Sequence, residues 1–314
     1  MIKKICFAAV AAVAAVGCCE KSVELPQYEE SEELVTFSVS VPGPETKNVG
    51  IAEEKNVNNL QVIVFNKYGL YETSAYASRS SVDLTCTAGE KRMIALVNAN
   101  REDNVKNVDD LAARSLYLKD TGEGDLVMLG DTTLTVSAGN PITVDVSYLS
   151  SKISLETVRL ELADEQHKDL PFAVKAVFLT NVAGDRQYMT SGNPTVWYHE
   201  GVYNSDNTLP FLHDRVNSGQ LISGEKQYNT KHYFYCYPNQ TDTKTRLVIQ
   251  TEIAGQIYYY PIEVDEVLEN NEYSYSVVLT RFGAERPDGT LDKGSYSVKV
   301  SMKSWIPNSS VVEI

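Results

Sequence analysis

The chain has 314 residues, enough for two ordinary domains, and a formal net charge of −14 at pH 7. Basic residues form no cluster anywhere along it, so the charge argues against nucleic acid and against anionic lipid surfaces as partners. Only Cys86 and Cys236 lie outside the first 19 residues. Because we place them in different domains, we expect two buried free thiols rather than a disulfide.

The first residues have the features of an export signal. A short basic region, residues 1–4, precedes an apolar, alanine-rich segment, residues 5–16, which is too short to span a bilayer because that takes about 20 residues. Residues 15–17 are Ala-Val-Gly, and with Cys18 they resemble a bacterial lipobox. We therefore expect residues 1–17 to be a signal peptide and the Cys18 thiol to carry a lipid anchor, the alternative being an unlipidated cysteine in a processed leader. Residues 20–33 are acidic and poor in apolar side chains, which predicts a flexible tether.

The next segment, residues 34–41, has the pattern of a strand that proteolysis could remove. Its apolar side chains alternate with Thr and Ser and fall on one face: Val35, Phe37, Val39 and Val41. Pro42-Gly43-Pro44 ends the strand, and Lys47 follows in a polar loop where a trypsin-like protease could reach extended backbone before Asn48. The pattern also fits an ordinary first strand followed by an incidental lysine.

The body of the chain shows short strands at the regular spacing of an all-β sandwich. In the first half we expect strands at 60–65, 71–77, 82–87, 93–97, 126–129, 133–136 and 142–146. Residues 108–116 have helical spacing, and Asn107 is a candidate N-cap for a small crossover helix. Residues 142–155 pass directly from one strand into another, so we place a domain boundary near Leu149.

The second half continues the all-β pattern. We expect strands at 153–162, 173–179, 233–237, 247–253, 257–264 and 273–280, with long loops over residues 183–228. Near the C-terminus, apolar residues again alternate with polar ones: Tyr296, Val298, Val300 and Met302. The chain then ends in the apolar residues Val311, Val312 and Ile314. Strands at the end of a chain need a cover, from their own domain or from a neighbouring molecule.

The sequence offers no catalytic constellation. His167, His199, His213 and His232 are scattered without the spacing of metal ligands, and nucleophile elbows and phosphate-binding loops are absent, so we expect no enzyme, no metal and no cofactor. Eight tyrosines gather in the second half and suggest either a glycan-stacking platform or cross-strand pairs within a sheet, of which we favour the pairs. They are Tyr233, Tyr235, Tyr237, Tyr258, Tyr259, Tyr260, Tyr273 and Tyr275.

Taken together, these residues resemble the major fimbrial subunits of type V pili, the FimA-like fimbrillins of Bacteroidales. The shared features, in chain order, are the lipobox at Cys18, the acidic tether, the first strand followed by a basic residue, the strands at 58–65 and 93–99, the start of the second domain around Lys152, and the C-terminal strand with Trp305.

The resemblance implies two tandem transthyretin-like β-sandwich domains, residues 48–149 and 150–314, after a signal peptide, residues 1–17, and a propeptide, residues 18–47. It also implies that a trypsin-like protease outside the cell cuts between Lys47 and Asn48 and so removes the first strand. Removing residues 34–41 would open an apolar groove in the first domain, and a neighbour's C-terminal strand, from residues 296–302, from residues 311–314 or from both, would fill it. The family site is often an arginine, so the lysine leaves the identity of the protease open.

The implied partners are other copies of the chain, other pilus subunits, the processing protease and, through the lipid of the precursor, the outer membrane. The implied location is the fimbrium and, for the lipid-anchored precursor, the exposed surface of the outer membrane, and the implied role of the pilus is to support adhesion. Two other interpretations stay open: a minor anchor or tip subunit of the same pilus, and a surface lipoprotein that binds glycans through its tyrosines.

Overall fold

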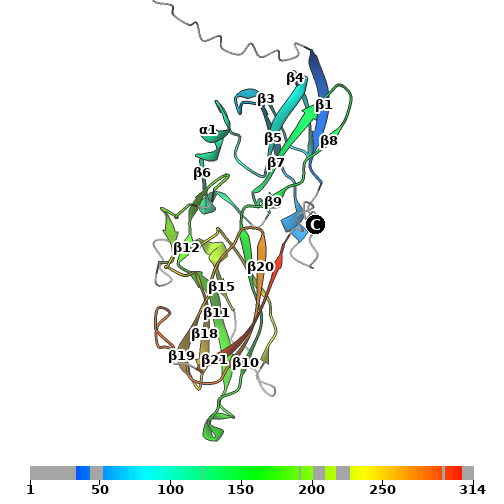
Figure 1. Ribbon diagram of the computed structural model, residues 1–314. Coiled ribbons are helices and arrows are strands. Elements are labelled where there is room, and N and C mark those ends of the chain that lie inside the picture. The colour runs from blue at the N-terminus through cyan, green and yellow to red at the C-terminus, as the bar shows by residue number, and fades with distance from the viewer. Residues whose placement is uncertain are drawn as a thin grey trace, which may run out of the picture.

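The computed structural model describes residues 33–42, 52–122, 124–190, 192–200, 209–216, 227–291 and 294–305. Within these ranges the molecule is elongated and consists almost entirely of strands, arranged as two groups of sheets one above the other (Figure 1). The predicted signal peptide and the predicted sites Cys18, Lys47, Asn48, Val311, Val312 and Ile314 lie outside the described residues.

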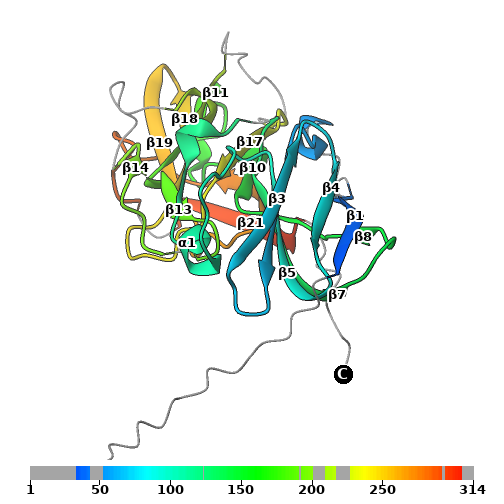
Figure 2. The ribbon, with the colours of Figure 1, turned by 90° about the horizontal axis from the view of Figure 1, so that it is seen from above.

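The first group is a two-layer β-sandwich. A five-stranded antiparallel sheet has the order β3 (Tyr71–Ala77), β2 (Leu60–Asn66), β5 (Gly89–Val97), β7 (Met128–Val136) and β9 (Ser147–Tyr148). Beside it lies a three-stranded sheet of β4 (Ser81–Thr87), β1 (Leu34–Ser40) and β8 (Ile142–Thr143), as Figure 2 shows from above. The alternating apolar residues of both sheets meet in one buried cluster, which includes Val62, Val64, Met93 and Leu84.

The predicted crossover helix is present as α1 (Val108–Ala112), and its buried Leu111 belongs to the same apolar cluster as Ile63 and Ile94 of the five-stranded sheet. Asn107 caps it as expected, since its side-chain oxygen accepts a hydrogen bond from the backbone nitrogen of Asp110 at 2.8 Å. Short 3-10 turns lie at η1 (Ala52–Lys55), η2 (Leu118–Asp120), η3 (Glu165–His167) and η4 (Pro210–Leu212).

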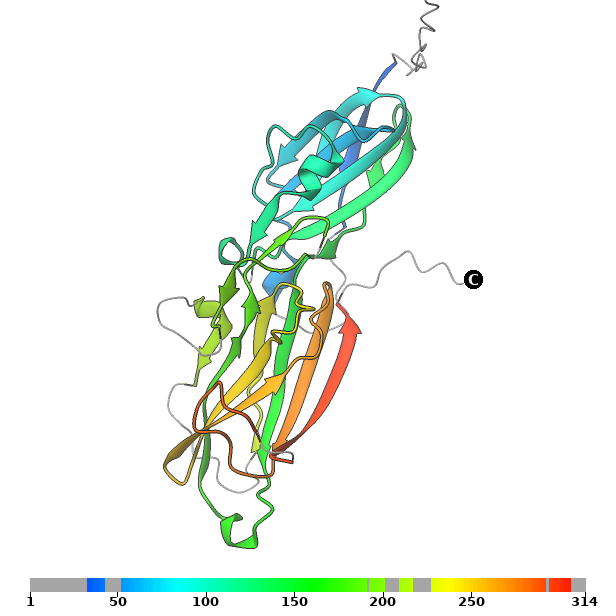
Figure 3. The same ribbon diagram turned by 60° about the vertical axis from the view of Figure 1, so that its left-hand side comes forward.

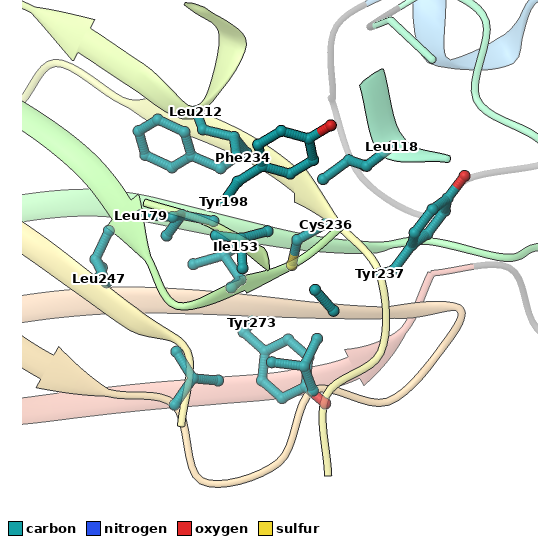
Figure 4. Close-up of a cluster of buried hydrophobic side chains, with 14 of the residues drawn as sticks. Leu118, Ile153, Leu179, Tyr198, Leu212, Phe234, Cys236, Tyr237, Leu247 and Tyr273 are labelled. Carbon is teal, nitrogen blue, oxygen red and sulfur yellow. The ribbon is translucent and has the colours of Figure 1, made fainter. Parts of the chain in front are cut away.

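The second group also has two main sheets. One contains β16 (Gln227–Tyr228), β10 (Ser151–Leu160), β20 (Asn271–Leu279) and β21 (Tyr296–Ser304), with β17 (His232–Cys236) also paired to β10. The other has the order β15 (His213–Arg215), β11 (Phe172–Thr180), β18 (Arg246–Ile253) and β19 (Gln256–Glu263). Between them pack large apolar side chains, among them Ile153, Phe234, Leu179, Leu247 and Tyr273 (Figure 4). The all-β sandwich fold expected from the sequence is therefore present.

Three details differ from the sequence-based expectation. Residues 128–136 form one continuous strand rather than two, because Gly130 continues the ladder by pairing with Ala95. Glycine is needed there, since a Cβ at residue 130 would lie only 2.4 Å from the Asp145 carbonyl oxygen. Only residues 142–143 of the strand expected at 142–146 are paired as a strand. The region expected to be long loops contains the short strands β12 (Val182–Ala183), β13 (Asp185–Gln187) and β14 (Trp197–Tyr198), besides β15 and β16.

The two groups are joined by packing as well as by the chain. β13 pairs with β6 (Ser115–Tyr117), and one large apolar cluster runs from Ile63 and Phe65 of the first group into the second. The boundary expected near Leu149 falls between β9 and β10 and remains a prediction.

Candidate functional site

The first strand, β1, is the central strand of its sheet. Along its whole length it pairs antiparallel with β4, from Leu34 opposite Thr87 to Ser40 opposite Ser81. On its other side it pairs parallel with β8 at two positions only, Val39 with Ile142 and Ser40 with Thr143. The removal of β1 would therefore unpair the full length of β4.

The buried face of β1 closes the core of the first sandwich. Val35, Phe37, Val39 and Val41 are 2%, 4%, 0% and 3% exposed. At about 1.5 to 3 kcal/mol for each buried apolar side chain, this face contributes on the order of 6 to 12 kcal/mol to the seating of the strand. The groove that removal of β1 would open is thus apolar and lined along one edge by the backbone of β4.

The outer face of β1 is held by polar contacts with the same neighbour. Thr36 Oγ1 lies 2.9 Å from Thr85 Oγ1, and Ser38 Oγ donates a hydrogen bond to Asp83 Oδ1 at 2.5 Å. Both contacts lie on the exposed side of the sheet, where water can replace them, so they stabilise the strand less than the buried face does.

The candidate donor residues near the C-terminus form β21 at the edge of its sheet, the red strand beside orange β20 in Figure 3. Among the described residues, β21 pairs with β20 alone, over nine positions from Tyr296 opposite Leu279 to Ser304 opposite Asn271. Tyr296 and Val298 are partly buried, whereas Val300 and Met302 are 48% and 59% exposed. This edge strand presents apolar side chains that its own domain does not cover.

A buried polar junction lies where the two groups of sheets meet. Lys152 Nζ donates a hydrogen bond to Glu54 Oε1 at 2.7 Å, and the hydroxyl of Tyr235 donates to the same oxygen at 2.6 Å. The hydroxyl of Tyr148 donates to the backbone carbonyl of Glu54 at 2.6 Å. Both charged side chains are only 1% exposed, so removing either partner would leave a buried uncompensated charge, at a cost of about 3 to 5 kcal/mol.

Aromatic rings enclose this junction. Lys152 Nζ lies 4.6 Å from the ring centre of Tyr233 and 5.6 Å from that of Trp305, and Trp305 stacks on Tyr148 with ring centres 4.1 Å apart. Burial, and then the negative charge of Glu54, raise the pKa of Tyr148, so its hydroxyl keeps its proton and serves as a donor. The sequence pointed to Lys152 and Trp305 but missed Glu54, because nothing in its local pattern shows that it pairs with a residue far away in the chain.

The tyrosine-rich region does not form a surface platform, so the glycan-platform interpretation is wrong for most of its residues. Five of the eight side chains are at most 5% exposed: Tyr235, Tyr237, Tyr260, Tyr273 and Tyr275. The other three, Tyr233, Tyr258 and Tyr259, are half-buried. The two cysteines of the body, Cys86 and Cys236, are both buried and free, as expected.

The described part of the chain contains no helix that is both long and apolar enough to cross a membrane. In the same residues, His, Cys, Asp and Glu side chains form no group of three that could hold a metal ion.

Comparisons with known proteins identify the family. The family of the "Major fimbrial subunit protein (FimA)" matches residues 36–245. A fimbrilin structure from Porphyromonas gingivalis is similar, with 15% identity, coverage of 87% of this chain and 98% of that chain, and a TM-score of 0.64. So is that of a candidate cell adhesion protein from Bacteroides eggerthii, with 18% identity, coverage of 88% and 97%, and a TM-score of 0.66.

The tip fimbrial protein Mfa3 from Porphyromonas gingivalis, solved with a C-terminal truncation, is a further structural relative, with 12% identity, coverage of 87% and 99%, and a TM-score of 0.53. At these identities the likeness shows a shared fold. A search among curated proteins found no match. Since the family match spans well over half of the sequence, the chain belongs to the major fimbrial subunit (FimA) family.

Proposed function

We propose that this fimbrial subunit reaches the cell surface as a lipoprotein precursor, attached through Cys18, and that a trypsin-like protease cuts it between Lys47 and Asn48. The cut frees β1, and a strand from the C-terminal region of a neighbouring copy takes its place. Each subunit then accepts one strand and donates another, and because this head-to-tail contact does not close on itself, it propagates as a filament.

The observation that supports this proposal most directly is the set of contacts that hold β1 in its sheet. After a cut at Lys47, the strand would be held by the β4 ladder, the short β8 contact, the exposed polar contacts with β4 and the burial of Val35, Phe37, Val39 and Val41. All of these interactions are available to another strand with the same alternation. Exchange therefore replaces one set of contacts with an equivalent one, at little net cost in free energy.

The incoming strand has two candidate sources in the chain. β21 has the required alternation, lies at a sheet edge and exposes Val300 and Met302. Val311, Val312 and Ile314 are also apolar and lie closer to the end of the chain, outside the described residues. Until cleavage, the resident β1 occupies the groove and prevents premature polymerisation.

The substitution Lys47→Ala tests the proposal. We expect an intact, lipidated, monomeric protein, whereas the wild type gives high-mass ladders on gels after mild heating and an N-terminus at Asn48 by mass spectrometry. Lys67→Ala, which changes a lysine in the β2–β3 turn, serves as the matched control and should assemble normally. Filaments that form normally from Lys47→Ala would refute the proposal. A wild-type protein recovered only as a lipidated monomer would instead indicate an anchor subunit.

A further inference from the structure

Two lysines are close to each other in the sequence of the connection between β1 and β2. Lys47 precedes the bond that the proposed function requires to be cut, and Lys55 lies at the end of η1. The side chain of Lys55 is exposed, so side-chain access alone would let a protease that recognises lysine bind there too. Something other than the identity of the residue must therefore decide between the two bonds.

The residue before Lys55 is fixed from three directions. The carboxylate of Glu54 accepts hydrogen bonds from Lys152 in β10 and Tyr235 in β17, and its backbone carbonyl accepts one from Tyr148 in β9. These contacts hold the turn of η1 against the buried junction. The chain at Glu54 can leave this position only if a fully buried ion pair is broken.

The residues after Lys55 are fixed as well, by Asn98 at the end of β5. Asn98 Nδ2 donates to the Asn56 carbonyl at 2.8 Å, and Asn98 Oδ1 accepts from the backbone nitrogen of Asn58 at 2.8 Å. The side chain of Asn58 in turn donates to Asp125 Oδ1 at 2.6 Å. The bond between Lys55 and Asn56 is thus bracketed by bound residues on both sides.

Susceptibility to proteolysis follows the burial and hydrogen bonding of the backbone, because a protease needs several residues in an extended conformation. A bond inside a held turn is cut only from a transiently opened form, at a rate set by how rarely that form appears. We propose that the buried Glu54–Lys152 pair selects the processing bond: it keeps η1 closed around Lys55, so that cleavage occurs at Lys47 and Glu54 stays in the mature subunit. This inference rests on the proposed function, in which a protease specific for basic residues processes the chain.

Retaining Glu54 has a structural consequence. A cut after Lys55 would remove the carboxylate that Lys152 and Tyr235 both contact, at the place where the two groups of sheets meet. A cut at Lys47 removes β1 but leaves this junction complete. The Glu54–Lys152 pair therefore confines cleavage to the segment that contains β1 and keeps η1 with the part of the chain that supports the acceptor groove.

Limited digestion with trypsin, with every new N-terminus read by mass spectrometry, tests the inference on the full chain. We expect the wild type to be cut at Lys47 and to resist at Lys55. In Glu54→Ala and in Lys152→Met, we expect cleavage after Lys55 to accelerate at least tenfold and to yield a second N-terminus at Asn56. Adding Lys55→Gln to Glu54→Ala should abolish that fragment. If the two charge variants fail to fold, Tyr148→Phe replaces them in the same digestion, because it removes only the hydroxyl that donates to the Glu54 carbonyl.

Lys91→Met is the control for general loss of stability. Lys91 is 2% exposed and pairs at 2.7 Å with the partly buried Glu72, so its substitution also breaks an ion pair that holds a buried lysine, away from η1. We expect this variant to leave Lys55 resistant, and equal cutting at Lys55 in Lys91→Met and Glu54→Ala would overturn the inference. So would rapid cutting at Lys55 in the wild type, or continued resistance in a folded Glu54→Ala. If Lys47 stays uncut in the wild type while cleavage after Lys55 accelerates in the variants, the role of the Glu54–Lys152 pair is supported and the proposed processing site at Lys47 is refuted.

Discussion

The hydrogen bonds of His199 fix its charge state. The side chain is fully buried, and its backbone has φ 52°, in the left-handed region. Nδ1 lies 2.7 Å from the Leu179 carbonyl, and Nε2 accepts a hydrogen bond from the Leu209 backbone nitrogen at 3.2 Å. Only a neutral ring protonated at Nδ1 satisfies both partners, because an imidazolium has no acceptor. Burial lowers the pKa of His199, opposed in part by the bond to Leu179, which agrees with this assignment.

This arrangement predicts that the protein loses stability in mild acid. The unfolded chain protonates this histidine near its ordinary pKa of 6.5, whereas the folded protein does so only at lower pH. The unfolded state thus binds more protons as the pH falls from about 6.5 toward the lowered folded pKa, and the free energy of unfolding decreases across that window. Urea denaturation at pH 7.5, 6.5 and 5.5 measures the slope.

The substitution His199→Asn should flatten that slope. It should also cost about 1 to 3 kcal/mol at pH 7.5, because it leaves buried partners unsatisfied, while asparagine tolerates the left-handed backbone. Burial also lowers the pKa of His213, so this residue should leave a smaller residual slope in the His199→Asn variant. His167→Asn, at a partly exposed position in η3, is the control, and an equal flattening in this variant would contradict the assignment to His199.

At the scale of single elements, β1 shows how far sequence patterns reach. The alternation of Val35, Phe37 and Val39 predicted both the strand and its buried face, because a half-buried strand imposes a period of two on its own residues. The Asn107 cap and the strands β2 and β3 were predicted for the same reason: their signals are local. The residues of the candidate removable strand could therefore be recognised from the sequence alone.

Features that depend on distant partners could not be predicted in this way. Nothing in the local sequence distinguishes Glu54 from the adjacent Glu53, and only the fold brings Glu54 against Lys152. β8 is paired at just two positions, where it meets β1 from far away in the chain, so the apolar residues after it suggested a longer strand. Tyr260 and Tyr275 gave the same sequence signal as surface tyrosines, although both are buried in the core.

The seating of β1 predicts that a free copy of the strand competes with assembly. A peptide of residues 33–42, added to cut subunits, should occupy the groove and reduce the high-mass ladders in proportion to its concentration. The matched peptide with Val39→Asp should need at least a tenfold higher concentration, because Val39 is 0% exposed and a carboxylate there would be buried without a partner. Equal inhibition by both peptides, measured by gel ladders and light scattering, would mean that the groove is not where assembly occurs.

At the scale of the whole molecule, the candidate acceptor and donor strands are connected through the buried junction. η1, which follows the β1 region, ends with Glu54 and Lys55, and β21 ends beside Trp305. The ring of Trp305 stacks on Tyr148, and its backbone nitrogen donates a hydrogen bond to the Asn270 carbonyl at 2.7 Å. A β21 strand that leaves as donor gives up its ladder with β20 and strains this stack. Its transfer therefore needs an acceptor groove that returns a comparable burial, which the groove of β1 offers.

If the departure of β1 is the step that permits polymerisation, then holding β1 in place after the cut should stop assembly without preventing cleavage. Thr36 and Thr85 are suited to this experiment because they lie opposite each other in the ladder, both are exposed, and their hydroxyl oxygens are 2.9 Å apart. The paired substitutions Thr36→Cys and Thr85→Cys should form a disulfide across the two strands. The natural thiol of Cys86 should not compete, because burial and the nearby Glu72 carboxylate raise its pKa to about 11 and keep it protonated at pH 8.

The oxidised double variant should be cut at Lys47 as fast as the wild type, yet stay monomeric, with both fragments migrating together on a non-reducing gel. Reduction should release the fragment that carries β1 and restore the high-mass ladders, so the same sample provides both outcomes. Thr85→Cys alone should assemble under both conditions. If the oxidised, cut double variant forms filaments, subunits join without vacating the groove, and an interface outside it carries the filament. If reduction frees the fragment but no ladders follow, loss of β1 is insufficient and the donor strand needs a separate release.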